Sequence, residues 1–270
     1  MNKEAWLRPV IALAQQAGEA IARIYTDESA WVRHKEDGSP LTAADMVAHR
    51  LIAEGLARLT PDLPLLSEEA ALPDWEIRRH WSRYWLVDPL DGTKEFVGRS
   101  GEFTVNIALI EANQPVLGVV VAPMLGLTWA ALAGGDALRL EGDKEVKIDT
   151  RQPEPPLRLV ASRRHREGKD ARLAERLTAE FGKLVRVDMG SSLKMCRIAE
   201  GAADLYPRLG PTCEWDTAAA DVILRAAGGA LLQADGNPLF YNKPSLLNPD
   251  FMALGAPAIW PRVQSCWSSL

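Results

Sequence analysis

The chain contains 270 residues, of which 47% are hydrophobic and 25% are charged, as in ordinary globular proteins. This length exceeds what one hydrophobic core usually accommodates, so we expect two domains or subdomains. The net charge of −5 disfavours nucleic-acid binding through a broad basic face. The three scattered cysteines are too few for a disulfide framework or a zinc knuckle. They indicate reduced thiols in the cytoplasm, with peripheral association at the inner membrane as the alternative location.

Two amphipathic helices are predicted in the N-terminal part of the chain. Apolar residues at spacings of three and four predict the first over residues 3–26. Charged residues interrupt the start of this helix, so no secretory signal is expected. A polar loop at 35–40 leads to Thr42, which is expected to cap a second helix that ends before Pro61.

The strand signals that follow predict an antiparallel sheet backed by these two helices. Strands are expected at 65–66, 84–87, 103–110, 115–121, 127–132 and 137–140. The uncharged stretch 115–135 has the length of a membrane-spanning helix. Pro123 and Gly126 interrupt it between two apolar runs, so two buried strands joined by a turn are favoured, and no membrane span is expected.

A second unit with alternating strands and helices is predicted in the C-terminal part. The proline-rich segment 151–156 is the clearest linker, so the expected domains are 1–150 and 151–270. The predicted strands are 157–161, 184–187, 203–206, 230–233 and 251–254, and the predicted helices are 169–181, 192–200 and 217–227. This order favours a mixed sheet flanked by helices, within an α+β or α/β fold.

The stretch Asp88-Pro89-Leu90-Asp91-Gly92-Thr93 concentrates the chemistry of the chain. We expect the preceding strand to stop at Asp88, where open α/β sheets place their ligands. Pro89 makes the turn rigid, and Thr93 opens a helical turn whose free N–H groups would face an anion. Two carboxylates, the Leu90 carbonyl and this helix start suit Mg²⁺ together with a phosphate. A surface Asp-Gly turn with Asp88 as a cap is the alternative interpretation.

These six residues resemble the signature of the inositol monophosphatase superfamily, the Mg²⁺-dependent and lithium-sensitive phosphatases. The continuation Lys94-Glu95-Phe96 resembles one branch, the 3′(2′),5′-bisphosphate nucleotidases of bacterial sulfur assimilation. The segments 42–45, 67–69, 190–194 and 214–220 agree with that branch in order and spacing, so the resemblance covers most of the chain. It implies the layered α-β-α-β-α sandwich of inositol monophosphatases and fructose-1,6-bisphosphatases.

The resemblance implies two or three Mg²⁺ ions in each active site. The implied ligands are Glu68, Asp88, the Leu90 carbonyl, Asp91 and Asp216. Asp216 would reach from the C-terminal part to bind the second metal ion. From the residues alone, Glu68 could equally be a solvated acid in a polar loop, and Asp216 a plain helix N-cap.

Asp45 and Thr93 are the implied catalytic pair, which orients the attacking water. Read without the resemblance, Thr42 and Asp45 make a capping-box-like pair at a helix start. Both roles can hold, because a capping carboxylate is also well fixed for positioning work.

The segment 190–194 is implied to line the substrate pocket. Its backbone and hydroxyl groups would serve the nucleoside, and its lysine would supply a charge near a phosphate; ordinary helix capping with a solvated lysine is the alternative. The predicted substrate-binding residues are Glu68, Leu90, Asp91, Gly92, Thr93, Gly190, Ser191, Ser192, Lys194 and Asp216.

Other conspicuous residues receive lesser roles. The basic run 162–166 reads as a solvated loop or as a collar for a second phosphate, through Arg163 or Arg164. The segment 247–251 also matches the nucleotidase branch and is expected to be structural. The four histidines, Cys213 and Glu214 receive no catalytic role.

The implied reaction is the hydrolysis of adenosine 3′,5′-bisphosphate to AMP and phosphate by a metal-activated water. A phosphatase of inositol or sugar monophosphates is the nearer alternative, disfavoured by Lys194 and by the Lys94-Glu95-Phe96 ending. A non-catalytic nucleotide sensor is the more distant alternative, since every implied ligand is present. The expected partner is thus a small phosphorylated nucleotide, while monomer and homodimer are both left open.

Overall fold

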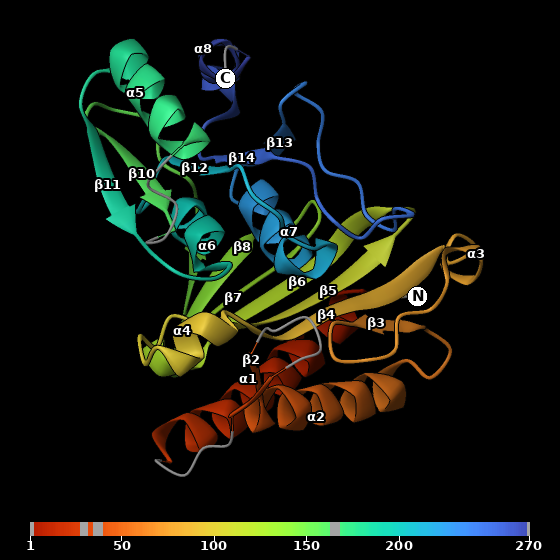
Figure 1. Cartoon of the computed structure of the whole chain (residues 1–270). Coiled ribbons are helices and arrows are strands. Elements are labelled where there is room, and N and C mark those ends of the chain that lie inside the picture. The colour runs from red at the N-terminus through yellow and green to blue at the C-terminus, as the bar shows by residue number, and fades with distance from the viewer. Residues whose placement is uncertain (1–2, 28–31, 35–39, 163–167, 269–270) are drawn as a thin grey trace.

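The computed structural model describes residues 3–27, 32–34, 40–162 and 168–268. Figure 1 shows helices and sheets that alternate in five layers. Two N-terminal helices lie against a seven-stranded sheet, two short helices separate this sheet from a five-stranded one, and two further helices cover the far side. The expected α-β-α-β-α sandwich is confirmed.

The first layer consists of α1 (Glu4–Thr26) packed against α2 (Ala43–Leu59). One face of each helix is buried, with Ile21 of α1 and Ile52 of α2 fully covered. These side chains join Trp85 and Val119 of the large sheet in one apolar cluster. The 3.6-residue periodicity of the two helices therefore places them on one face of the sheet.

The seven strands lie in the order β3-β4-β5-β6-β7-β8-β9, in which β3 and β4 are parallel and all other neighbours antiparallel. Their bounds are β3 (Leu65–Ser67), β4 (Arg83–Asp91), β5 (Thr104–Glu111), β6 (Gln114–Ala122), β7 (Leu127–Leu132), β8 (Ala137–Glu141) and β9 (Lys144–Ile148). The uncharged stretch forms β6 and β7, joined by the 3-10 helix η1 (Pro123–Leu125), as predicted. Among the described residues, no helix has the length and apolarity needed to cross a membrane.

The middle layer consists of α6 (Leu193–Ala199) and α7 (Ala218–Ala226). Helix α7 approaches β6 so closely that a Cβ atom at Gly118 would lie 2.2 Å from the Ala219 carbonyl oxygen. Only glycine permits this approach, because any other residue would collide with the helix backbone. The contact fixes the start of α7, directly after the turn that carries Asp216.

The second sheet has the strand order β11-β10-β12-β14-β13. Strand β10 is parallel to β11 and β12, and β14 is antiparallel to β12 and β13. The bounds are β10 (Leu157–Ala161), β11 (Leu184–Asp188), β12 (Leu205–Arg208), β13 (Ala230–Gln233) and β14 (Phe251–Leu254). The outer layer is α5 (Lys169–Phe181) with α8 (Trp260–Trp267), which pack against each other above this sheet (Figure 1).

One apolar cluster joins both predicted domains. It contains Leu86 and Val120 of the large sheet, Ile223 of α7 and Ala253 of the small sheet. The two sheets fall on either side of residue 150, whereas this cluster spans both sides. The boundary at residue 150 stays a prediction.

The sequence patterns miss several short elements. These are β1 (Val32–His34), β2 (Pro40–Thr42), α3 (Trp75–Arg78), β9, η2 (Glu214–Asp216), η3 (Pro257–Ile259) and α8. Most have three or four residues, too few to display a periodicity, and β9 begins with two charged residues at a sheet edge. The loop expected at 35–40 overlaps β2 at Pro40, and the helix expected at 217–227 begins at Ala218, after η2.

Candidate active site

The two aspartates of the central motif lie on a strand that continues through Pro89. Strand β4 does not stop at Asp88 as predicted, because it remains paired with β5 as far as Asp91. Asp88 lies opposite Asn106 and Asp91 opposite Thr104, so β4 carries one extra residue in a bulge. The Leu90 N–H donates to Asp88 Oδ1 at 3.0 Å and closes the bulge. Gly92, with φ of 94°, then turns the chain into α4 (Thr93–Val97).

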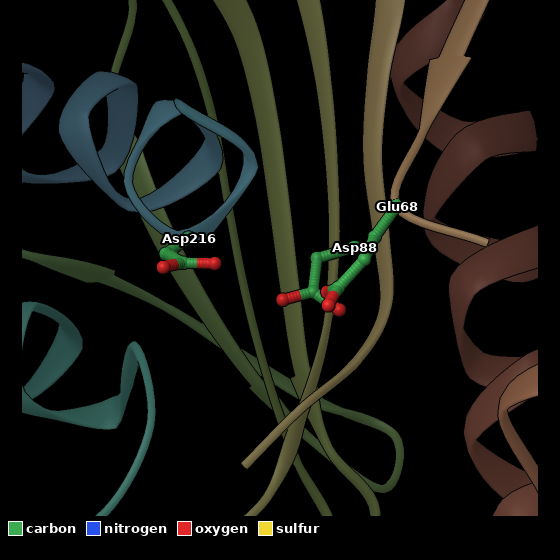
Figure 2. A group of neighbouring side chains, drawn as sticks. All are labelled: Glu68, Asp88 and Asp216. Atoms are coloured by element: carbon green, nitrogen blue, oxygen red, sulfur yellow. The ribbon is translucent and has the colours of Figure 1, made fainter. Parts of the chain in front are cut away.

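Three carboxylates from distant parts of the chain converge beside this bulge. Ligand oxygens of Glu68, Asp88 and Asp216 all lie within 4.8 Å of one another. Figure 2 shows Glu68 and Asp88 side by side, with Asp216 facing them from the end of η2, just before α7. Asp216 is fixed by the Cys213 N–H, which donates to its Oδ2 at 2.8 Å. The structure thus brings these three acids together, and their role as metal ligands stays a prediction.

The electrostatics of this group favour a bound cation. Burial raises the pKa of Asp88 well above its usual value, and the nearby charges of Glu68, Asp91 and Asp216 raise it further. Burial, followed by the charge of Asp91, likewise raises the pKa of Asp216. Several acids so close together are costly to ionise without a counter-charge, and carboxylate oxygens are the hard ligands that Mg²⁺ prefers. The residues therefore fit a divalent cation.

Asp91 and Leu90 lie next to this group of three. Asp91 lines the adjacent pocket and is not one of the three grouped carboxylates, and its Oδ2 accepts the Ser192 N–H at 2.6 Å. Burial raises the pKa of Asp91 to about 6, although the charge of Lys194 and the Ser192 N–H oppose this rise. Leu90 is buried, and its carbonyl oxygen lies 3.5 Å from the Thr93 hydroxyl. Metal ligation by Asp91 and Leu90 stays a prediction.

Asp45 lies in the first turn of α2, and its charge contributes to the raised pKa of Asp88. The side chain of Thr42 lies outside the described residues, so the capping-box alternative is not resolved there. Thr93 begins α4, directly after Gly92 and two residues after Asp91. The assignment of Asp45 and Thr93 as the catalytic pair stays a prediction.

A pocket of about 170 Å³ opens beside the carboxylates. Its lining combines acids with cations; they are Asp91, Glu95, Asp216, Lys94, Lys194 and Arg208. Gly190, Ser191, Ser192 and Lys194 of the predicted substrate segment all contribute to it. The pocket therefore offers three cations to an anionic group that binds beside the carboxylate cluster.

The segment 190–194 is bound tightly to the large sheet. A Cβ atom at Gly190 would lie 2.8 Å from the Glu102 carbonyl oxygen, so glycine is required here, and the Gly190 N–H donates to Glu102 Oε2 at 2.8 Å. Ser192 is buried, with its N–H on Asp91 and its hydroxyl 2.8 Å from Asn106 Oδ1. The donors expected from Ser192 are thus engaged within the chain, and Ser192 anchors α6 to the sheet.

Lys194 is buried and points back onto its own segment. Its Nζ donates to the Ser191 carbonyl at 2.7 Å and lies 5.1 Å from the centre of the Tyr206 ring. Burial lowers the pKa of Lys194 to about 8, and the charge of Asp91 opposes the drop. The ammonium group therefore carries most of its charge at neutral pH. Lys194 lines the pocket, and its ammonium group is fixed there by the hydrogen bond to the Ser191 carbonyl oxygen.

Arg208 is a pocket cation that sequence analysis missed. It ends β12, and its guanidinium donates to the carbonyl oxygens of Gly210 and Pro211 at 3.2 and 2.8 Å. Its charge partly opposes the rise in the pKa of Asp216. No local pattern around Arg208 marks it, because only the fold carries β12 to the carboxylate cluster.

Glu214 and Arg78 are buried charges with a structural role that sequence analysis also missed. Glu214 is 0% exposed and accepts two consecutive backbone N–H groups of the segment 242–244, at 2.6 and 2.9 Å. Arg78 donates to that same segment at 3.0–3.1 Å. Arg78 and Glu214 thus bind the same segment. Through it, α3, which follows Glu68 in the chain, is connected to η2, which carries Asp216.

The remaining predictions concern supporting residues. Asn248 donates to the Cys213 carbonyl oxygen and the Thr217 hydroxyl, at 2.7 and 3.1 Å, in agreement with a structural role for 247–251. His49 Nδ1 lies 2.9 Å from the Ser67 hydroxyl, and His80 is exposed. Arg163 and Arg164 lie outside the described residues, so a role in holding a phosphate stays a prediction.

The chain matches the profile of the inositol monophosphatase family over residues 2–264. The 3′(2′),5′-bisphosphate nucleotidases CysQ of Escherichia coli K12 and Salmonella typhimurium LT2 are 50% and 51% identical to it over 247 residues, which are 91% of this chain and 98% of each relative. A crystal structure of CysQ from Bacteroides thetaiotaomicron has a TM-score of 0.83 at 39% identity, over 93% of this chain and 97% of that one. The suhB protein of Bartonella henselae shares the fold, with a TM-score of 0.79 at 23% identity over 97% of this chain and 98% of its own. The chain belongs to the inositol monophosphatase family.

Proposed function

We propose that the protein is a metal-dependent phosphomonoester hydrolase, a 3′(2′),5′-bisphosphate nucleotidase that converts adenosine 3′,5′-bisphosphate to AMP and phosphate. The observation that carries the proposal is the three-carboxylate group beside a pocket with buried or anchored cations. A bisphosphorylated nucleotide needs both features, since one phosphate reacts while the other must be bound. Identity of 50% with CysQ nucleotidases over 91% of the chain supports this substrate class.

Glu68, Asp88, Asp91, Asp216 and the Leu90 carbonyl would hold two or three Mg²⁺ ions. Such ions lower the pKa of a bound water and neutralise charge on the reacting phosphate. The raised pKa values of Asp88 and Asp216 support this assignment, because the acids gain most from a cation where they are costly to ionise alone.

The other residues orient the reactants. Asp45 and Thr93 would hold the attacking water in line with the bond from phosphorus to the 3′ oxygen. The turn at Gly92 and Thr93 would donate backbone N–H groups to the phosphate oxygens. As water adds to phosphorus, that bond breaks and the 3′ oxygen takes up a proton, which gives AMP and inorganic phosphate. No covalent phosphoenzyme is required.

A substrate panel tests this function. Phosphate release is measured from adenosine 3′,5′-bisphosphate, AMP and inositol 1-phosphate, with Mg²⁺ and with EDTA. We expect Mg²⁺-dependent release that is fastest from the bisphosphate. A preference for inositol 1-phosphate would assign the chain to the other substrate class of its family, and binding of the nucleotide without release would indicate a sensor.

Lys194 is expected to select the bisphosphate. A charge-assisted contact is worth ~1.5–3 kcal/mol, so Lys194→Met should raise KM for adenosine 3′,5′-bisphosphate roughly 10- to 100-fold. KM for inositol 1-phosphate should hardly change, because that substrate brings no second phosphate. Methionine keeps the aliphatic part of the side chain that packs against Tyr206. Lys183→Met is the control for the loss of one positive charge, because Lys183 is exposed and does not line the pocket. Equal losses on both substrates would show that Lys194 only holds the turn at Ser191.

A further inference from the structure

Asn106 is a buried amide beside the carboxylate cluster. It lies on β5 directly opposite Asp88 of β4. Side chains of directly opposed residues point to the same face of a sheet, with Cβ atoms about 4.5–5.5 Å apart. The turn η2, which carries Asp216, packs on both strands. Asn106 therefore lies next to Asp88 on the sheet face that faces Asp216.

The orientation of this amide is fixed by Ser192. The Ser192 hydroxyl lies 2.8 Å from Asn106 Oδ1 and 2.8 Å from Thr104 Oγ1. Because Oδ1 accepts the hydrogen bond from Ser192, which directly precedes α6, Nδ2 is the polar atom that still needs a partner. Asn106 is 1% exposed, and Nδ2 has no hydrogen-bond partner among the described residues. A buried donor without an acceptor is costly, so its retention beside a ligand carboxylate needs a reason.

Asp88 can supply the missing acceptor. Its Oδ1 accepts the Leu90 N–H, but a carboxylate has about four lone-pair sites, which leaves room for a cation and for a further donor. Carboxylates that bind metals are generally held by outer hydrogen bonds that fix their orientation. We propose that Asn106 is a positioning residue, whose Nδ2 donates to the Asp88 carboxylate when the cluster binds Mg²⁺. This inference rests on the metal-dependent function proposed above.

Two isosteric variants test the proposal. Asn106→Leu and Thr104→Val each remove one of the two side-chain partners of Ser192, but only Asn106→Leu removes a donor beside Asp88. Mg²⁺ binding to the full chain is measured by calorimetry without substrate, and the melting temperature is measured in EDTA. Loss of an outer hydrogen bond to a metal ligand typically costs 10- to 100-fold in affinity, so we expect Asn106→Leu to weaken Mg²⁺ binding about tenfold. Thr104→Val should bind Mg²⁺ like the wild type.

The metal-free melting temperature separates positioning from structure. If Asn106 only anchors α6 through Ser192, both variants should melt at a lower temperature than the wild type and should bind Mg²⁺ with the same affinity as each other. That outcome would overturn the proposal. Asn106→Val, which suits a strand, replaces the leucine variant if leucine prevents folding. If the wild type binds no Mg²⁺, the proposed function fails; if the wild type and Asn106→Leu bind it equally, only the role of Asn106 fails.

Discussion

We expect Asp88→Asn to abolish Mg²⁺-dependent phosphate release while the protein stays folded. Asp88 is 1% exposed and lies within 4.8 Å of both Glu68 and Asp216, so its carboxylate is the centre of the proposed metal site. Asparagine keeps the side-chain volume and an oxygen for the Leu90 N–H, but it removes the charge that a divalent cation requires. Phosphate release and Mg²⁺ binding by calorimetry should both be lost.

The same substitution should stabilise the metal-free protein. The folded-state pKa values of Asp88, Asp91 and Asp216 are raised, so the folded chain holds protons that the unfolded chain releases. The stability that these groups contribute is complete below pH ~4, the unfolded value, and is lost as the pH rises through the folded values. In EDTA, Asp88→Asn should raise the melting temperature by ~2–4 °C per ~1 kcal/mol recovered. This gain should be largest at neutral and alkaline pH and shrink toward pH ~4.

Asp143→Asn provides the matched control for Asp88. Asp143 is exposed in the turn between β8 and β9, away from the cluster, so its substitution should alter neither Mg²⁺ binding nor the metal-free melting temperature. Mg²⁺-dependent turnover that persists in Asp88→Asn would remove Asp88 from the proposed metal site. A fall of the metal-free melting temperature would show that the acids do not repel one another in the fold.

Long periodic elements could be predicted from the sequence, whereas the bulge at the site could not. Helix α5 has the predicted bounds, since its apolar spacing and the flanking glycines act locally. Strand β4 extends past Asp88 because pairing of Asp91 with Thr104 of β5 overrides the turn preference of Pro89 and Gly92. That pairing places both aspartates on the sheet rather than in a loop.

Charged residues within a recognisable motif could also be predicted from the sequence. The residues that surround and hold them in the fold could not. Asp88 and Asp216 lie in short patterns with their own local chemistry, and the structure brings them together. Asn106, Arg208 and Glu214 carry no local signal, because their partners are far away in the sequence. The Asn106 contact with Ser192, for example, spans 86 positions, and a buried hydrogen bond of that range exists only once the layers are packed.

Asp45→Asn and Thr93→Val are each expected to lower kcat by about 10²- to 10⁴-fold, the usual range for a group that assists proton transfer, with little change in KM. Asp45 is buried in the first turn of α2, and its charge contributes to the raised pKa of Asp88, whereas Thr93 begins α4 two residues after Asp91. If the two residues orient one water, the loss in the double variant should be smaller than the product of the single losses.

The competing role for Asp45 is that of a carboxylate that stabilises a helix start. Asp170 also lies in the first turn of a helix, α5, and it does not belong to the carboxylate cluster, so Asp170→Asn removes a comparable interaction with a helix dipole. We expect Asp170→Asn to lower the melting temperature slightly and to leave kcat unchanged. Asp45 only stabilises the start of α2 if Asp45→Asn behaves in the same way. The same conclusion follows if the reduction of kcat in the double variant equals the product of the reductions in Asp45→Asn and Thr93→Val.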